Sequence, residues 1–193
     1  MNDKNTNRTI EYYNKYADRY SDVTRNADMS DIYKRFEEHL KPGSRILDLG
    51  CGSGRDSKYF LDRGYDVVSL DASEAMCRKT QELTGKEAVH KRIEDMNYEN
   101  EFDAVWACAS MLHVDKGDMI KIFAKVMKAL KIDGVFYASW KYGKGEQTRD
   151  DGRTFANYTE TKVCDMVYSV SGAGQVVLCD LINKRHCRSH NIY

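Results

Sequence analysis

The sequence lacks the features that mark several large classes of protein. Its 193 residues contain one proline, and no apolar run reaches the length of a signal peptide or a membrane span. Thirty Lys and Arg balance thirty Asp and Glu, so the whole-chain charge gives no reason to expect DNA or an anionic membrane as the main partner. These absences predict a cytoplasmic protein that does not depend on a membrane.

The cysteines also lack a pattern. Six are present, at positions 51, 77, 108, 164, 179 and 187, with no CxxC pair and no regular spacing. Free thiols in a reducing compartment are therefore favoured over a disulfide framework, and no metal site is expected. Hydrophobic residues make up 41% and charged residues 31% of the chain, which is typical of a globular protein. The length fits one domain.

Apolar periodicity predicts helices first and then an alternation of strands and helices. Residues 8–20 and 29–40 have helical spacing, and the second segment ends at Pro42-Gly43. Strands are expected at 45–49, 66–70, 88–92, 102–107 and 134–140, and helices at 55–63, 74–83 and 115–131. This alternation predicts an α/β fold with a mainly parallel central sheet and helices on both faces. Ligands of such sheets bind at the carboxyl ends of the strands.

A glycine-rich turn follows the first expected strand. Residues 48–54 read Asp-Leu-Gly-Cys-Gly-Ser-Gly, in which the glycines allow a sharp turn and close approach of a ligand to the backbone. A tight turn in an unrelated fold is the alternative. The dinucleotide pattern GxGxxG is not met, because the residue three after Gly52 is Arg55. No P-loop is present, which excludes a P-loop nucleotide hydrolase.

Two acidic positions lie at the ends of later strands. Asp71 closes the second strand, where a carboxylate can accept hydrogen bonds from both hydroxyls of a ribose; the alternative is an acid that stabilises a helix N-terminus. The acidic pair Glu94-Asp95 follows the third strand, and a carboxylate there could receive an adenine amino group while Met96 packs on the ring. An acidic pair in a solvated turn is the alternative there.

Three segments together resemble a known family. Residues 46–56 are similar to motif I of the class I S-adenosylmethionine-dependent methyltransferases, and residues 102–114 to the fourth-strand motif of a small bacterial branch related to the tellurite-resistance type. Residues 129–136 resemble the motif entering strand five, although Ile132 stands where the family usually has proline. The resemblance covers about residues 8–160 and implies a Rossmann-like fold.

The resemblance also implies the cofactor and its ligands. The cofactor would be S-adenosyl-L-methionine, with the glycine turn cradling its methionine part and Asp71 holding its ribose. A carbonyl of Ala107 or Cys108 would accept from its ammonium group. The residues assigned to the cofactor in this way are Asp48, Gly50, Cys51, Gly52, Asp71, Ala72, Met76, Asp95, Met96, Ala107 and Cys108.

The residues of the transfer step are predicted from position. His113 follows the fourth strand at the rim where an acceptor should lie, which makes it the candidate general base; the alternative is a buried, inert histidine. Tyr13 and Tyr20 belong to the lead-in helix, which in the family folds over the cofactor, and a plain packing role is their alternative. Lys141 and Arg153 could bind an anionic acceptor, or lie on a solvated loop.

The expected organisation is a single domain over residues 1–193. Residues 1–40 would form a helical lid, 41–140 the cofactor-binding core, and 141–193 an acceptor-side loop with an atypical C-terminus. Residues 182–193 contain few large apolar side chains, so the C-terminal strands are expected to be incomplete. The sheet would then end early at an exposed edge, or a partner subunit would cover it in a homodimer.

Three functions remain open from the sequence. The first is a methyltransferase acting on a small molecule, with RNA as the alternative acceptor. The second is a protein that binds the cofactor without catalysis, and the third a nicotinamide-dependent oxidoreductase, against which the missing GxGxxG spacing counts.

Overall fold

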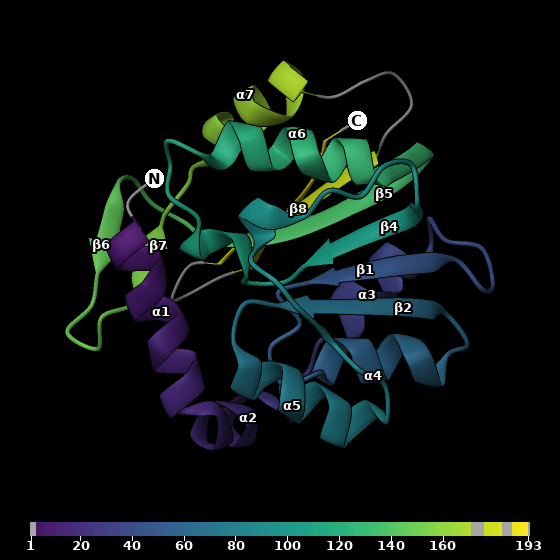
Figure 1. The fold of residues 1–193 in the computed structure, drawn as a ribbon. Helices are drawn as coiled ribbons and strands as arrows, with labels where there is room; N and C mark the ends of the chain where they lie inside the picture. Colours follow the sequence, from purple (N-terminus) through teal and green to yellow (C-terminus); the bar gives the residue numbers. More distant parts are fainter. Residues whose placement is uncertain (1–2, 171–175, 183–186, 193) are drawn as a thin grey trace.

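The fold is built on a seven-stranded sheet in the order β3-β2-β1-β4-β5-β8-β9, seen in Figure 1. We analysed a computed structural model, in which residues 3–170, 176–182 and 187–192 are described. The strands are β1 (Arg45–Leu49), β2 (Asp66–Asp71), β3 (Val89–His90), β4 (Phe102–Ala107), β5 (Leu130–Lys141), β8 (Val176–Ile182) and β9 (Cys187–Ile192). A separate hairpin consists of β6 (Glu146–Thr148) and β7 (Thr154–Ala156). The α-helices are α1 (Asp3–Lys15), α2 (Ala17–Thr24), α3 (Ser30–Glu37), α4 (Arg55–Asp62), α5 (Glu74–Thr84), α6 (Met119–Ala129) and α7 (Glu160–Val170).

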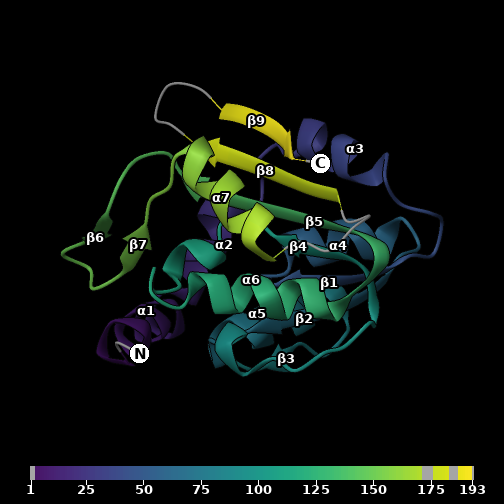
Figure 2. The same ribbon diagram turned by 90° about the horizontal axis from the view of Figure 1, so that it is seen from above.

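The central strands are apolar on both faces, as a sheet covered by two layers of helices requires. Successive side chains of a strand point to opposite faces, so Ile46 packs with helices α3 and α4 while Leu47 belongs to the core beneath α6 and α7. Figures 1 and 2 show these helix layers on the two sides of the sheet. Strands β1 to β5 and β8 pair in parallel. The predicted α/β fold with a mainly parallel sheet is confirmed.

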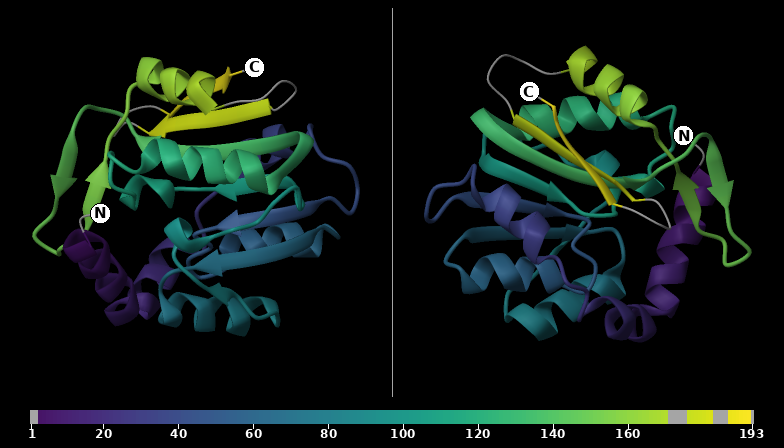
Figure 3. Two further views of the ribbon diagram at one scale, coloured as in Figure 1. Left: turned by 45° about the horizontal axis from the view of Figure 1, so that its top comes forward. Right: turned by 180° about the vertical axis from the view of Figure 1, so that it is seen from behind.

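The lead-in segment differs from the single helix expected over residues 8–20. The chain bends at Tyr16, which separates α1 from α2 and has φ −117° and ψ 26°. Because of this bend, Tyr13 of α1 and Tyr20 of α2 meet edge to face, with ring centroids 5.1 Å apart. Helix α1 lies beside the β6–β7 hairpin (Figure 3), where the Thr154 N–H donates to Thr9 Oγ1 over 3.3 Å. Among the described residues, no helix combines the length and the apolar character needed to cross a membrane.

The expectation of incomplete C-terminal strands is wrong. Strand β9 pairs antiparallel with β8, from Ile182↔Cys187 to Val177↔Ile192, and completes the sheet. An edge strand is held through its backbone on one side only, so it does not need the apolar run of a central strand. Since β9 covers the edge of β8, the argument for a homodimer through that edge loses its premise. Residues 183–186 and 193, on which part of this expectation fell, lie outside the described residues.

A buried ion pair ties α3 to β8. The guanidinium of Arg35 donates to both carboxylate oxygens of Asp180, over 3.0 and 3.1 Å, and the Tyr137 hydroxyl donates to the same carboxylate over 2.9 Å. The Asp180 side chain is fully buried, whereas that of Arg35 is 31% exposed. A buried carboxylate without its cation is strongly destabilising, so this pair constrains how α3 packs on the sheet.

We expect Arg35→Ala to lower the free energy of unfolding by about 2 kcal/mol. This is less than the loss of a fully buried partner, because Arg35 is partly solvated and Tyr137 still donates. Urea unfolding followed by circular dichroism measures the change. Arg78→Ala is the matched control, since its pair with Glu74 is solvent-exposed on both sides and should contribute less than about 0.5 kcal/mol. Equal losses in both variants would contradict the prediction.

Candidate active site

The glycine turn after β1 is shaped by close approach of the backbone. Gly50 has φ +79°, and a Cβ there would lie 2.3 Å from the Cβ of Ser110, so only glycine fits. The Gly50 and Cys51 N–H groups both donate to the Leu70 carbonyl, over 2.7 and 3.0 Å, which ties the turn to the end of β2. At Gly52, with φ +56°, a Cβ would meet only the Tyr20 ring, at 3.7 Å. Gly52 therefore presents its backbone to an open space beneath Tyr20.

Asp71 joins this turn to helix α5. One carboxylate oxygen accepts from the Gly52 N–H over 2.9 Å, and the other from the Ser73 N–H over 2.8 Å. Burial raises the pKa of Asp71 to about 6, although these backbone donors lower it in part. Each oxygen keeps a lone pair for a further donor. The carboxylate is thus fixed in place and keeps acceptor capacity for the hydroxyls of a ligand.

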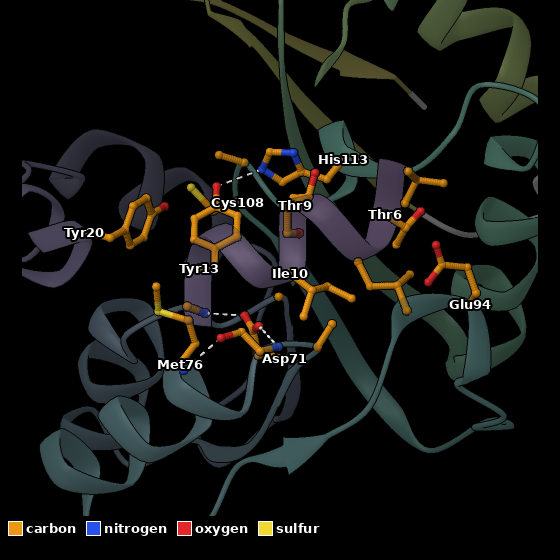
Figure 4. A pocket seen from close by; sticks show the side chains of 18 residues that line it. Thr6, Thr9, Ile10, Tyr13, Tyr20, Asp71, Met76, Glu94, Cys108 and His113 are labelled. Atoms are coloured by element: carbon orange, nitrogen blue, oxygen red, sulfur yellow. Dashed lines mark hydrogen bonds between the residues drawn. The ribbon is translucent and has the colours of Figure 1, made fainter. Parts of the chain in front are cut away.

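A cavity lies at the carboxyl ends of β1, β2 and β4 and encloses about 740 Å³ of empty space, its open mouth included. Eighteen residues line it, as Figure 4 shows. They are Thr6, Thr9, Ile10, Tyr13, Tyr20, Gly50, Gly52, Asp71, Ala72, Ser73, Met76, Ile93, Glu94, Cys108, Ala109, Ser110, His113 and Val114. Two of these residues are acidic, and none of the lining residues is a lysine or an arginine. The charge of the lining suits a ligand that carries positive charge and no phosphate.

His113 lies across the cavity from Asp71, and Tyr13 of α1 reaches toward it (Figure 4). The ring Nδ1 lies 2.8 Å from the Thr154 carbonyl oxygen, and Nε2 lies 2.9 Å from the Tyr13 hydroxyl. Because a carbonyl only accepts, Nδ1 carries the proton, and the lone pair of Nε2 accepts from Tyr13. Burial is the main cause that lowers the pKa of His113 to about 4. The imidazole is therefore neutral near pH 7 and has one fixed tautomer.

The two tyrosines of the lead-in helices both line the cavity. Burial raises the pKa of Tyr13 and that of Tyr20 above the usual value, so both hydroxyls stay protonated. Cys108 also faces the cavity, and burial raises the pKa of its thiol to about 12, which keeps it unreactive. The structure thus brings together His113, Tyr13 and Tyr20, the three residues predicted for the transfer step.

Five of the residues predicted to bind the cofactor lie outside the lining. Asp48 is buried below the turn, where it accepts from the Ser57 hydroxyl over 2.5 Å and burial raises the pKa of its carboxyl. Met96 packs in the core. The others are Cys51, Asp95 and Ala107. Asp48, Met96 and Ala107 are therefore buried beneath the cavity, whereas the Asp95 side chain is exposed.

The lining includes residues that sequence reasoning missed. Near the end of β3 the cavity is bounded by Ile93 and Glu94, whose carboxylate is 3.6 Å from Arg92 Nε. The short 3₁₀ turn Ile93–Asp95 decides which of the two adjacent acids faces inward, and the sequence showed only that an acidic pair was there. Thr6, Thr9 and Ile10 of α1 also line the cavity. Because Thr9 and Ile10 follow Thr6 by three and four residues, helical periodicity predicts that all three lie on one face of the helix.

Comparison with solved structures shows which class of fold this is. The complex of DhpI with S-adenosylhomocysteine matches with a TM-score of 0.70 and 19% identity, covering 97% of this chain and 98% of that one. A Burkholderia thailandensis 1,6-didemethyltoxoflavin-N1-methyltransferase with bound 1,6-didemethyltoxoflavin and S-adenosylhomocysteine matches with a TM-score of 0.69 and 18% identity, covering 92% and 78%. The fold is that of the class I methyltransferases.

Sequence comparison agrees with the fold. Residues 46–134 match the methyltransferase domain family, and the Bacillus subtilis protein YqeM is 30% identical over 130 residues, or 64% of this chain and 53% of YqeM. Residues 46–134 therefore belong to the methyltransferase domain family, and the fold around them is that of the class I S-adenosylmethionine-dependent methyltransferases. A TehB-like methyltransferase from Corynebacterium glutamicum is among the similar structures, with a TM-score of 0.62 and 19% identity over 83% of each chain. The chain spans about half, or less, of the length of the first curated relatives it matches.

Proposed function

We propose that this protein transfers a methyl group from S-adenosylmethionine to a small-molecule acceptor. The observation that carries the proposal is the lining of the cavity, which holds Asp71 and Glu94 and neither lysine nor arginine among its described residues. S-adenosylmethionine has a cationic sulfonium and an ammonium group but no phosphate. NAD has a pyrophosphate, for which such a lining offers no cationic side chain.

The geometry of the cavity supports an assignment of the residues that would hold the cofactor. The free lone pairs of Asp71 would accept from the two ribose hydroxyls, since its carboxylate is already fixed by backbone donors. Met76, Ile93 and Ala72 offer an apolar slot for the adenine ring, with Glu94 at its edge to accept from the amino group. The backbone at Gly50 and Gly52 would face the methionine part.

We propose that the first forty residues serve as a lid and that the segment after β5 serves the acceptor. Helix α1 lines the cavity through Thr6, Thr9, Ile10 and Tyr13. Hydrogen bonds at Thr9 and at Asn14 attach the helix to the rest of the protein. Thr9 Oγ1 accepts from the Thr154 N–H, and Asn14 Oδ1 accepts from the Ser73 hydroxyl over 2.7 Å. Admission of a large ligand would therefore require these bonds to open.

The chemistry of the cofactor, when bound, is that of an electrophilic methyl group on a sulfonium. The chain would align the acceptor with that methyl and exclude water, which is worth up to about 7–11 kcal/mol of the barrier. For an acceptor with an ionisable proton, the Tyr13 oxygen would take that proton while the Tyr13 proton moves to Nε2 of His113. The Thr154 carbonyl would stabilise the resulting imidazolium through Nδ1–H.

A small acceptor fits the surroundings of the cavity better than RNA does. Residues 141–156, which include the β6–β7 hairpin, have a net charge of +1. The four cations are Lys141, Lys144, Arg149 and Arg153, and the three anions are Glu146, Asp150 and Asp151. Nucleic acid binding requires a broad excess of positive charge along a surface. The similar Burkholderia structure has 1,6-didemethyltoxoflavin bound, and not RNA.

Calorimetric titration with S-adenosylmethionine, S-adenosylhomocysteine and NAD tests the cofactor. We expect micromolar binding of the two adenosyl compounds and none of NAD, because of the acidic lining. The proposal would be overturned if NAD alone binds, or if neither adenosyl compound gives heat of binding with a folded sample. If S-adenosylmethionine binds but no S-adenosylhomocysteine forms with any acceptor in a broad panel, the protein binds the cofactor without catalysis.

A further inference from the structure

Three cationic side chains from different segments converge on one aromatic ring. The Nζ of Lys141, at the end of β5, lies 3.2 Å from the centroid of the Phe155 ring. The guanidinium carbons of Arg149 and Arg153 lie 4.7 and 5.4 Å from the same centroid. Phe155 is itself buried, so the three cations cover its ring. We call Lys141, Arg149 and Arg153 the cationic cluster.

The positive charge of this cluster is only partly compensated. Arg153 donates to Asp151 through Nε and a terminal nitrogen, over 3.1 and 2.6 Å. Within the part of the chain that the structure describes, no carboxylate lies within ion-pair distance of Lys141 or Arg149. The pKa of Lys141 is lowered to about 8 by burial first, and then by Arg149 and Arg153. Two cations therefore lie side by side without an anion of their own.

The cationic cluster is one ring away from the cavity. Phe155 packs against the His113 ring with centroids 4.8 Å apart, and His113 lines the cavity on its other side. Arg153 also lies over the Tyr12 ring at 3.9 Å, next to Tyr13. The cluster is thus grouped around the side of the cavity where the proposed proton acceptor lies, away from Asp71 and the glycine turn.

We propose that the methyl acceptor carries a carboxylate or phosphate group, and that the cationic cluster binds it while the reacting atom faces Tyr13. The inference rests on the proposed function. An oxyanion would supply the counter-charge that Lys141 and Arg149 lack, and arginine can bind either anion through two hydrogen bonds. Two groups of residues then bind two different molecules. The acidic lining, which has no lysine or arginine, holds the cofactor, and the cationic cluster binds the acceptor.

The test uses inorganic phosphate and benzoate as probes. Protein saturated with S-adenosylhomocysteine is titrated with each anion at pH 7, with chloride keeping the ionic strength constant, and the Phe155 ring and Lys141 side-chain NMR signals are followed. We expect saturable shifts with at least one anion. Arg149→Gln and Lys141→Gln should each weaken that binding at least fivefold. Lys144→Gln, an exposed lysine of the same loop, should leave it unchanged.

Each outcome separates the two proposals. Shifts that stay linear to the highest concentration, or equal affinities in all three variants, would overturn the anion site. Arg149 is exposed, so Arg149→Gln is expected to fold. If Lys141→Gln does not fold, Arg149→Gln alone still tests the anion site. The titration is repeated without S-adenosylhomocysteine. Anion binding in a protein that fails to bind the adenosyl compounds would refute the proposed function while keeping the anion site. Preference for phosphate or benzoate tells which anion the acceptor carries.

Discussion

Replacing His113 with alanine should lower the rate of methyl transfer by about 10²-fold, the low end of the contribution of a positioned general base, because a pKa of about 4 makes its imidazole a weak base. The reason for this expectation is that Nε2 of His113 accepts a hydrogen bond from the Tyr13 hydroxyl and that its tautomer is fixed by the Thr154 carbonyl. Affinity for S-adenosylhomocysteine should change little, because the ring faces Asp71 from across the cavity. Single-turnover formation of S-adenosylhomocysteine, with an acceptor found by screening, measures the rate.

Two further variants sharpen this prediction. Tyr13→Phe removes the hydroxyl that is proposed to link the acceptor to Nε2, so it should lower the same rate while keeping the aromatic packing on Tyr20. His39→Ala, at an exposed position beyond α3, is the control and should leave the rate unchanged. If the loss in His113→Ala is confined to cofactor binding, His113 has no part in the transfer step.

Asp71→Ala should weaken the binding of S-adenosylmethionine by about 1.5–3 kcal/mol, or roughly 10- to 150-fold. The variant loses the acceptor proposed for the ribose and also releases the Gly52 and Ser73 N–H groups that the carboxylate holds. Calorimetry gives the affinity. Asp66→Ala, at the exposed start of the same strand, should bind as the unchanged protein does. Unchanged affinity in Asp71→Ala would refute the ribose assignment.

The pH dependence of binding gives a second readout of Asp71. Its pKa of about 6 in the free protein means that the carboxylate gains a proton as the pH falls through 6. A protonated carboxyl accepts fewer hydrogen bonds, so affinity should be greatest above pH 7 and should fall by up to about tenfold per pH unit below 5. In Asp71→Asn the affinity is lower and this dependence should disappear.

The sheet and the glycine turn could be predicted from residue patterns. Strands such as 45–49 and 102–107 are rich in apolar residues, and three glycines at 50, 52 and 54 indicate a tight turn. The close approach of Ser110 that requires Gly50 is seen only in the fold. The edge strand β9 was missed because it pairs through its backbone, and backbone pairing leaves little trace in side-chain pattern.

The contacts within the site could not be predicted from the spacing of residues along the sequence, because they depend on the three-dimensional fold. Glu94 and Asp95 are neighbours in the chain, and only the 3₁₀ turn decides that Glu94 lines the cavity. The bond between Tyr13 and His113 joins positions 100 residues apart, so the sequence could name both residues but not their contact. The gathering of Lys141, Arg149 and Arg153 over Phe155 likewise required the fold of the hairpin.

The contacts of Thr154 have a consequence for how such an enzyme could diversify. Its N–H donates to Thr9 and its carbonyl accepts from His113, so the hairpin orients helix α1 and the imidazole through main-chain atoms that every residue type except proline supplies. The lining of the cavity, in contrast, comes entirely from residues 6–114. Side chains of the hairpin can therefore change under selection for a new acceptor. The tautomer of His113 and the residues that line the cavity would stay the same.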